Sequence, residues 1–373
     1  MPTVLEAIAI ANPPTSKSQS EAAAFVKQMQ GIPESVLCRI DQIYASSAID
    51  RRYTCIADYD RPTSKFEFYP RTPSLLPPPG TARRNEMYRK WAPEIAEQAA
   101  RKALLSASRS PSAITHVIAV TCTGFFSPGL DVHLIKSLGL NKSTQRTVIG
   151  FMGCCAAFNA LRTANAICVA DGLAVVLIVC VELCTLHFQP IESLEDAVIS
   201  SIFADGAAAA ILSANPPRRT EPALAISGSM SLLDENSLED MTWTIGNTGF
   251  LMGLSPRVPT RLGAIVSEYV DSLLESSGSS RSQVDAWAIH PGGRKVLDIA
   301  AESLDLAPAA LDDSYAVLRD YGNMSSPTIF FIMARLLDRH RISPMRSIVA
   351  IGFGPGLTIE GCVLTAAEGF VGC

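Results

Sequence analysis

The two halves of this chain share one pattern of helices and strands, and this repeat limits its possible folds more than any other feature. The first half predicts helix 91–106, strand 116–120, helix 131–138, strand 146–151, helix 156–170 and strand 174–181. The second half predicts helix 261–276, strand 285–289, helix 295–303, a short polar turn, helix 326–340 and strand 347–351. Alternating strands and helices imply parallel crossovers with helices covering the sheet faces. We therefore expect an α/β fold in which two similar halves pack as layers around shared helices.

Two proline-containing stretches interrupt this pattern. Residues 70–84 are rich in Pro, Arg and Thr and are expected to form an extended surface segment. Residues 214–222 contain an Asn-Pro-Pro sequence and two arginines. We place the division of the chain there, giving an N-terminal half, 1–214, and a C-terminal half, 215–373.

Composition and charge exclude several classes of protein. With 48% hydrophobic and 18% charged residues the chain is typical of a compact globular protein, and its net charge of −5 argues against nucleic acid as a main partner. Residues 1–14 lack the basic start and long apolar core of a signal peptide. The longest apolar run, 173–181, is far shorter than the roughly 20 residues of a membrane helix. We expect neither export nor membrane insertion.

The ten cysteines lie largely within apolar runs, which favours reduced thiols in a cytoplasmic protein over a disulfide scaffold. Cys180, Cys184 and His187 are close enough in sequence to suggest a metal site. A strand, however, would place the two cysteines on one face and the histidine on the other. No fourth ligand is nearby, so we expect no metal.

The repeat brings four polar or reactive residues toward one region. Cys154 and Asn323 occupy the same place in their halves, at the start of the helix that runs into the middle. Cys122 and His290 each lie just beyond the carboxyl end of a strand. In open α/β sheets that end is where ligands bind. The sequence therefore predicts that these residues converge.

Cys154 is a candidate nucleophile within Gly-Cys-Cys-Ala-Ala. The amino end of a helix favours the thiolate, and small neighbours leave space for an acyl group. Taken alone, the residue could equally be a buried structural cysteine, the role that we assign to Cys155.

His290 and Asn323 complete the candidate site. The Pro-Gly-Gly turn after His290 would expose its imidazole at the sheet edge, where an imidazolium would lower the pKa of Cys154 and give an ion pair near neutrality. The side-chain amide of Asn323 would donate to a developing oxyanion. A solvated or structural histidine and a helix-capping asparagine are the alternatives.

Four motifs that contain these residues resemble a known family. They are Phe-Met-Gly-Cys-Cys-Ala-Ala, Ile-His-Pro-Gly-Gly, Tyr-Gly-Asn-Met-Ser-Ser and Gly-Phe-Gly-Pro-Gly. Together with Asp-Arg-Arg-Tyr at 50–53 and Phe-Ala-Asp-Gly-Ala at 203–207, they resemble the type III polyketide synthases, the chalcone synthase relatives of the thiolase-like superfamily. The resemblance extends from about residue 9 to residue 364.

The resemblance implies a thiolase-like five-layer αβαβα fold, a homodimer, an acyltransferase activity, and no metal or redox cofactor. It implies that Cys154 accepts a starter from an acyl-CoA. Malonyl-CoA then loses carbon dioxide while His290 and Asn323 stabilise the enolate, which attacks the bound thioester. Repeated extension and ring closure would give a pyrone, resorcinol or phloroglucinol product.

The resemblance also assigns residues to the cavity and the coenzyme A site. Phe203 matches the gatekeeping phenylalanine, although a core aromatic is the ordinary interpretation. The second aromatic of the plant enzymes is replaced by Met252, which favours an adaptable apolar wall and an aliphatic starter. Further cavity positions are Cys122, Thr123, Cys184, His187 and Ser325.

Of three basic residues that plant enzymes offer to the coenzyme A phosphates, only Arg39 has a basic counterpart here; the others are Gln42 and Ser46. The residues that could compensate are Arg51, Arg52, Arg294 and Lys295.

Two alternatives remain open. A ketoacyl-ACP synthase III-like enzyme shares the Cys, His and Asn chemistry but performs one condensation with a carrier-protein-bound malonyl unit. A non-catalytic acyl-binding or scaffold protein could use the same fold. Consumption of malonyl-CoA without a carrier protein would distinguish a polyketide synthase from the first alternative. Selective alkylation of Cys154 would argue against the second.

Overall fold

The computed structural model describes residues 2–217, 223–342 and 345–367. Part of the expected division at 214–222 therefore lies outside the described residues. The strands are β1 (Thr3–Ala11), β2 (Thr15–Ser18), β3 (Arg51–Thr54), β4 (His116–Thr121), β5 (Gln145–Gly150), β6 (Val175–Leu183), β7 (Asp205–Ser213), β8 (Leu224–Leu233), β9 (Met241–Gly246), β10 (Gly249–Leu254), β11 (Ala286–Ile289), β12 (Ser347–Gly354) and β13 (Thr358–Ala366).

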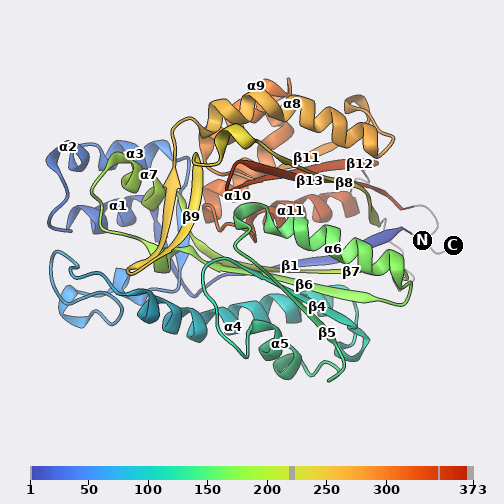
Figure 1. Ribbon diagram of the computed structural model, residues 1–373, viewed down its shortest axis with the longest axis horizontal. Coiled ribbons are helices and arrows are strands. Elements are labelled where there is room, and N and C mark those ends of the chain that lie inside the picture. Colours follow the sequence, from blue (N-terminus) through green and yellow to red (C-terminus); the bar gives the residue numbers. More distant parts are fainter. Residues whose placement is uncertain (1, 218–222, 343–344, 368–373) are drawn as a thin grey trace.

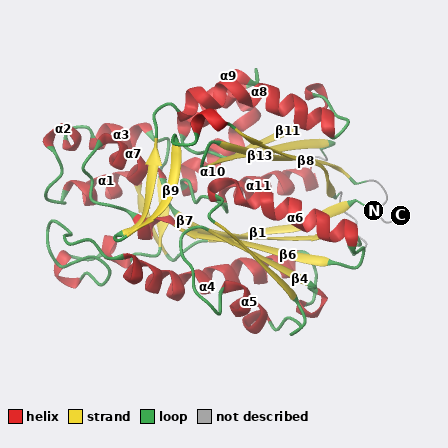
Figure 2. Cartoon of the chain, viewed as in Figure 1, coloured by secondary structure: helices red, strands yellow, loops and turns green. Residues whose placement is uncertain are grey.

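The helices cover and separate the main strands in a layered arrangement. They are α1 (Gln19–Lys27), α2 (Glu34–Leu37), α3 (Ile40–Ser46), α4 (Thr81–Ser106), α5 (Leu130–Leu138), α6 (Ala156–Ala170), α7 (Leu194–Ile202), α8 (Val258–Ser276), α9 (Arg294–Ser303), α10 (Asp312–Tyr321) and α11 (Thr328–Ile342). Figure 1 shows α4 and α5 outside one group of strands, α6 and α11 in the middle, and α8 and α9 outside the second group. Figure 2 shows the same alternation of helical and strand layers. The expected five-layer α/β architecture is confirmed.

Strand pairing shows the repeat directly. In the first half β1 is antiparallel to β7, β7 is antiparallel to β6, and β6 is parallel to β4. In the second half β8, β13, β12 and β11 follow the same order with the same directions. The two groups join where β1 pairs with β8, so that nine strands are connected in the order β11-β12-β13-β8-β1-β7-β6-β4-β5. Within the described ranges, β5 has no counterpart in the second half.

The middle helical layer is the most deeply buried part of the fold. Small residues on α6, such as Ala157, Ala160 and Ala164, are fully buried and allow close packing. On α11, Phe330 and Phe331 fill the space between the two groups of strands. Because both helices pack against both groups, their amino-terminal ends are fixed from two sides.

Three details differ from the sequence-based expectations. The predicted short polar turn contains a 3-10 helix, Pro308–Leu311, followed by α10, whose acidic first turn suits a helix amino terminus. The segment 70–84 is not extended to its end, because α4 begins at Thr81 and buries Arg84 completely. The expected parallel pairing is found between β4 and β5, between β4 and β6, and between β11 and β12. In contrast, β7 and β13 run antiparallel to β6 and β12.

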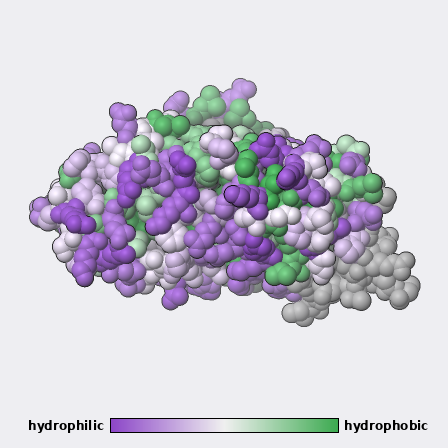
Figure 3. Space-filling model, turned by 90° about the horizontal axis from the view of Figure 1, so that it is seen from below, coloured by the Kyte–Doolittle hydropathy of each residue, from purple (hydrophilic) through white to green (hydrophobic). Residues whose placement is uncertain are grey.

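The molecular surface agrees with the composition. The face shown in Figure 3 is largely hydrophilic, with smaller hydrophobic patches between the polar side chains. None of the described helices combines the length and apolar character needed to span a membrane.

Candidate active site

Cys154 lies in a short 3-10 helix, Gly153–Cys155, directly before α6. Gly153 has φ +67°, and a Cβ atom there would lie 2.4 Å from Cδ of Pro355. A Cβ atom on Gly354 would lie 2.5 Å from Sγ of Cys155. The glycine-rich loop after β12 therefore packs against the nucleophile segment at van der Waals distance, and both positions require glycine.

Cys155 has a different environment from Cys154. Its thiol donates to the carbonyl of Met152 at 3.2 Å, and the residue belongs to the buried core around α6 and α11. The structural role expected for Cys155 agrees with this placement.

The structure brings Cys154, His290 and Asn323 to one cavity, which Phe203 also lines. His290 follows β11 directly, and its backbone N–H donates to the carbonyl of Ile351 at 2.9 Å. In the described part of the chain neither ring nitrogen of this histidine has a hydrogen-bond partner. The thiol of Cys154 points toward Oδ1 of Asn323, 4.0 Å away.

The amide of Asn323 is held in one orientation. The backbone N–H of Ser325 donates to Oδ1 at 2.8 Å, while Nδ2 makes a long contact of 3.5 Å to the carbonyl of Gly292. Because the backbone N–H of Ser325 is a donor, the Asn323 atom that it contacts must be the amide oxygen. This contact therefore fixes which end of the amide is Oδ1 and which is Nδ2. Nδ2 is consequently the end that can donate to a ligand oxygen.

Burial shifts the pKa values of the two titratable residues of the site. Desolvation raises the pKa of Cys154 to about 11, with a further rise from the nearby Glu182 carboxylate. Desolvation also lowers the pKa of His290 to about 3. Both pKa shifts favour a neutral thiol and a neutral imidazole, because burial penalises the charged form of each group. Desolvation therefore acts against the ion pair expected from the sequence, which remains a prediction.

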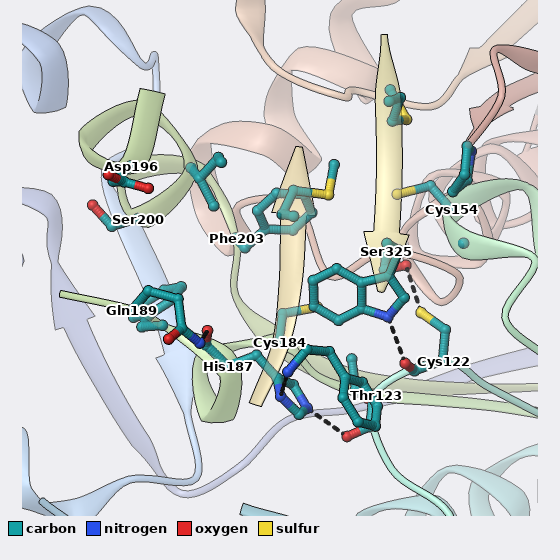
Figure 4. A pocket seen from close by; sticks show the side chains of 18 residues that line it. Cys122, Thr123, Cys154, Cys184, His187, Gln189, Asp196, Ser200, Phe203 and Ser325 are labelled. Carbon is teal, nitrogen blue, oxygen red and sulfur yellow. Dashed lines mark hydrogen bonds between the residues drawn. The ribbon is translucent and has the colours of Figure 1, made fainter. Parts of the chain in front are cut away.

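The larger cavity continues from Cys154 and is lined by all seven predicted cavity residues (Figure 4). They are Cys122, Thr123, Cys184, His187, Phe203, Met252 and Ser325. Phe203 and Met252 also line the cavity that contains His290 and Asn323. These two side chains thus stand at the junction between the larger cavity and the catalytic candidates.

His187 forms the rigid inner wall of this cavity. Nε2 lies 2.7 Å from the carbonyl of Thr123, and Nδ1 accepts from the backbone N–H of Phe250 at 3.0 Å. These contacts identify Nε2 as the protonated nitrogen. The imidazole stacks on the Phe250 ring with centroids 4.3 Å apart and meets the Trp243 ring edge-on. Burial lowers the pKa of His187 to about 4, so the wall is neutral and largely apolar.

The expectation that Cys184 and His187 face opposite sides of a strand was wrong. Residues Cys184–His187 form a 3-10 helix, and both side chains line the same cavity. Among the described residues, no group of His, Cys, Asp or Glu side chains is arranged to hold a metal ion.

Sequence reasoning missed Trp243, Phe250 and Glu182. Trp243 is the direct cross-strand partner of Met252 in the β9–β10 hairpin, and its indole donates to the carbonyl of Cys122 at 2.8 Å. The Gly-Asn-Thr-Gly turn between alternating residues 241–254 signals this hairpin. A hairpin register applied to Met252 would have identified Trp243.

Glu182 is a fully buried carboxylate beneath the cavity. It accepts hydrogen bonds from the backbone N–H of Cys122 at 2.9 Å, from Thr123 Oγ1 at 2.7 Å and from Ser326 Oγ at 2.7 Å. Burial raises the pKa of Glu182. Its bonds connect the loop after β4 with the loop before α11, which belong to different halves.

The candidate coenzyme A residues lie outside the two cavities. Arg39, before α3, and Lys295, on α9, are both exposed. Arg294 pairs with Asp298 at 3.5 Å. Arg52, in contrast, is buried and donates to main-chain carbonyls, so it does not offer its charge to a phosphate at the surface.

Comparison with known proteins identifies relatives along nearly the whole chain. The N-terminal domain of chalcone and stilbene synthases matches residues 2–216, and the C-terminal domain matches residues 229–368. The chain is 32% identical over 361 residues to the alpha-pyrone synthesis polyketide synthase-like Pks18 of Mycobacterium tuberculosis, covering 96% of this chain and 90% of that protein. It is 30% identical over 322 residues to the 3,5-dihydroxyphenylacetyl-CoA synthase of Amycolatopsis orientalis, covering 86% and 84% of the two chains.

Solved structures give the same result. The crystal structure of PKS-I from the brown alga Ectocarpus siliculosus superimposes with a TM-score of 0.93 at 33% identity, covering 98% of each chain. The C-terminal type III polyketide synthase domain of Steely1 from Dictyostelium gives a TM-score of 0.89 at 29% identity, covering 98% of this chain and 99% of that one.

The raised pKa of Cys154 predicts how its thiol reacts with iodoacetamide. Since burial raises the pKa of this thiol, its alkylation rate should increase roughly tenfold per pH unit between about pH 6 and pH 9. Peptide mass spectrometry of the native protein measures the rate at each cysteine, and Cys154→Ser corrects for background from the exposed Cys38. A rate that is already constant from about pH 6 upward would show a preformed ion pair instead.

Proposed function

The chain belongs to the chalcone and stilbene synthase family and is a type III polyketide synthase, and we propose that Cys154 is its nucleophile. The proposed substrates are an acyl-CoA starter and malonyl-CoA. The observation that carries this proposal is the meeting of Cys154, His290 and Asn323 at one buried cavity, with the thiol facing the amide.

Loading of the starter requires a proton to move during the attack. The sulfur of Cys154 bonds to the thioester carbonyl carbon, its proton passes to the neutral imidazole of His290, and the bond to the coenzyme A sulfur breaks. The departing coenzyme A thiolate takes the proton from His290. Among the described residues no hydrogen bond occupies either ring nitrogen of His290, so its imidazole is free to accept the thiol proton.

Extension begins with the loss of carbon dioxide from malonyl-CoA. The electron pair of the broken carbon–carbon bond moves to the thioester, giving an enolate whose oxygen accepts hydrogen bonds from Asn323 Nδ2 and from the N–H of His290. The enolate carbon attacks the acyl group on Cys154, and the carbon–sulfur bond breaks. The product is a β-ketoacyl-CoA, and the released thiolate takes up the extended chain in the next cycle.

The cavity favours an aliphatic starter and a compact cyclic product. Met252 gives the cavity wall a flexible side chain where the plant enzymes have an aromatic one. The packed rings of His187, Trp243 and Phe250 give the inner end of the cavity a fixed shape. The names of two relatives point to an α-pyrone and to a dihydroxyphenyl ring. We propose a pyrone, resorcinol or phloroglucinol product made by repeated extension, rather than the single condensation of a ketoacyl-ACP synthase III-like enzyme.

Coenzyme A binding is assigned to exposed basic residues. Arg39 directly precedes α3 and is exposed, as are Gln42 and Ser46 on that helix, and Lys295 is exposed near the start of α9. We propose that Arg39 and Lys295 contact the phosphates. Each step uses only a thiol, an imidazole and an amide, so no metal or redox cofactor is proposed. The chemistry calls for neither nucleic acid nor a membrane as a partner.

We propose a cytoplasmic location. Nine cysteines among the described residues are free thiols, which suits a reducing compartment.

We propose a homodimer from the outer edge of β5, which pairs with no other strand among the described residues. This strand ends the sheet, and residues 145–148 are exposed although Val148 is apolar. Phe125 and Met152 are further exposed apolar side chains near in sequence to β4 and β5. An unprotected edge of this kind readily pairs with another strand. The same edge of a second copy is the proposed occupant.

The substrate proposal is tested with the purified chain, malonyl-CoA and a panel of aliphatic and aromatic acyl-CoA starters, with no carrier protein. We expect cyclic products from aliphatic starters, identified by mass spectrometry, and none from the Cys154→Ala variant. Extension of aromatic starters alone would contradict the assignment of Met252. A requirement for carrier protein would favour the single-condensation alternative.

The dimer proposal is tested by Val148→Arg, which places a charge on the exposed edge of β5. We expect the wild type to sediment as a dimer in analytical ultracentrifugation and the variant to shift toward monomer. Leu173→Arg is the matched control, because Leu173 is also apolar and 77% exposed but lies outside β5. A monomeric wild type, or an equal shift in both variants, would exclude the β5 interface.

A further inference from the structure

The carboxyl end of α7 is held by a buried arginine. The last four carbonyls of a helix have no partner inside the helix and must be satisfied from outside. Here Nη1 of Arg52 donates to the carbonyl of Ser200 at 2.7 Å and to that of Phe203 at 2.8 Å. A cation at this position also interacts favourably with the helix dipole.

Gln19 supports the same helix end. Its Nε2 donates to the carbonyl of Ser201 at 2.7 Å and to Oγ of Ser47 at 2.8 Å. Its Oε1 accepts from Nε of Arg52 at 2.9 Å. Arg52 and Gln19 thus form one connected unit, which we name the α7 clamp.

The remaining carbonyl of the helix end is bound by the candidate oxyanion residue. The backbone N–H of Asn323 donates to the carbonyl of Ile202 at 3.0 Å, and the backbone N–H of Ala204 donates to the carbonyl of Asn323 at 2.8 Å. Phe203 and Asn323 therefore form an isolated parallel β-bridge. The main chain that carries the Asn323 amide is attached to the end of α7.

Arg52 also contacts the residue before Asn323. Gly322 has φ +72°, and a Cβ atom there would lie 2.9 Å from Cγ of Arg52. The guanidinium lies over the rings of Tyr44 and Phe188, at 5.7 Å and 6.0 Å from their centroids. Arg52 is 6% exposed, and no carboxylate pairs with it in the described part of the chain.

A buried arginine without an acidic partner is costly unless its donors are used elsewhere. Here its donors go to the carbonyls of Ser200 and Phe203 and to Gln19, which itself donates to Ser201, so these contacts all lead to the carboxyl end of α7. Arg52 therefore has a role inside the protein instead of the surface role in coenzyme A binding that the sequence suggested.

We propose that Arg52 is a positioning residue for decarboxylation and condensation. Through the α7 clamp it fixes the main chain at Phe203 and Asn323, and so fixes Nδ2 of Asn323 where the enolate oxygen forms. This inference rests on the proposed function, because it assigns Arg52 a role through the amide that stabilises the enolate.

The test compares Arg52→Met and Arg52→Lys with wild type in two assays: release of carbon dioxide from malonyl-CoA, and acylation of Cys154 by the starter, followed by intact-protein mass spectrometry. A displacement of the amide by about 1 Å should lower decarboxylation about 10- to 100-fold in Arg52→Met. Acylation of Cys154 should stay close to the wild-type rate. Lysine keeps the positive charge and can donate to the carbonyls but lacks the separate Nε donor that bonds to Gln19, so Arg52→Lys should recover part of the loss.

The decisive measurement is made in the Asn323→Ala background. If Arg52 acts through Asn323, adding Arg52→Met should change decarboxylation by less than about twofold, because the amide is already absent. An unchanged effect of Arg52→Met in this background, or wild-type decarboxylation in Arg52→Met itself, would overturn the proposal. Arg101→Met, at an exposed arginine of α4, is the control for loss of a charge and should match wild type.

Two further outcomes remain interpretable. If Arg52→Met does not fold, Gln19→Leu removes the other member of the α7 clamp, and the same non-additivity with Asn323→Ala is expected. If wild type neither acylates Cys154 nor releases carbon dioxide, the proposed function itself fails, and this result is distinct from a failure of the clamp.

Discussion

The arrangement of the site depends on the hydrogen bonds of one buried carboxylate, that of Glu182. A buried carboxylate has to be fully hydrogen-bonded, and its donors must therefore stay in place. Those donors come from Cys122 and Thr123 in one half and from Ser326 in the other. The loops that follow β4 and precede α11 are thereby brought together beside Cys154. With the Phe203–Asn323 bridge, this network converts a repeated fold into a single cavity to which both halves contribute.

Burial of the reactive side chains is the second property that the fold imposes on the site. Burial raises the pKa of Cys154 and lowers that of His290, so burial disfavours the charged form of each residue. The imidazole can accept the thiol proton during attack, because neither ring nitrogen is hydrogen-bonded within the described part of the chain. A site of this kind keeps water away from a carbanion, which water would otherwise protonate before carbon–carbon bond formation.

The sequence alone predicted much of this architecture because the repeat and the strand ends are local signals. Residues after β4 and β11, and the cysteine before α6, follow from hydrophobic periodicity and glycine-rich turns. The alanine-rich β7 was missed, since alanine has little strand preference, and the acidic α10 was taken for a turn. Contacts between distant segments, such as Arg52 with the end of α7, have no local signal. Protonation states could not be predicted either, because they depend on the degree of burial.

The central claim is that Cys154, His290 and Asn323 act at one point but in separable steps. It is tested most directly by measuring starter acylation of residue 154 and decarboxylation of malonyl-CoA in Cys154→Ala, His290→Ala and Asn323→Ala. The account predicts no acylation in Cys154→Ala, loss of both reactions in His290→Ala, and, in Asn323→Ala, retained acylation with decarboxylation reduced about 100- to 1000-fold. Acylation of another cysteine, or wild-type decarboxylation in Asn323→Ala, would contradict it.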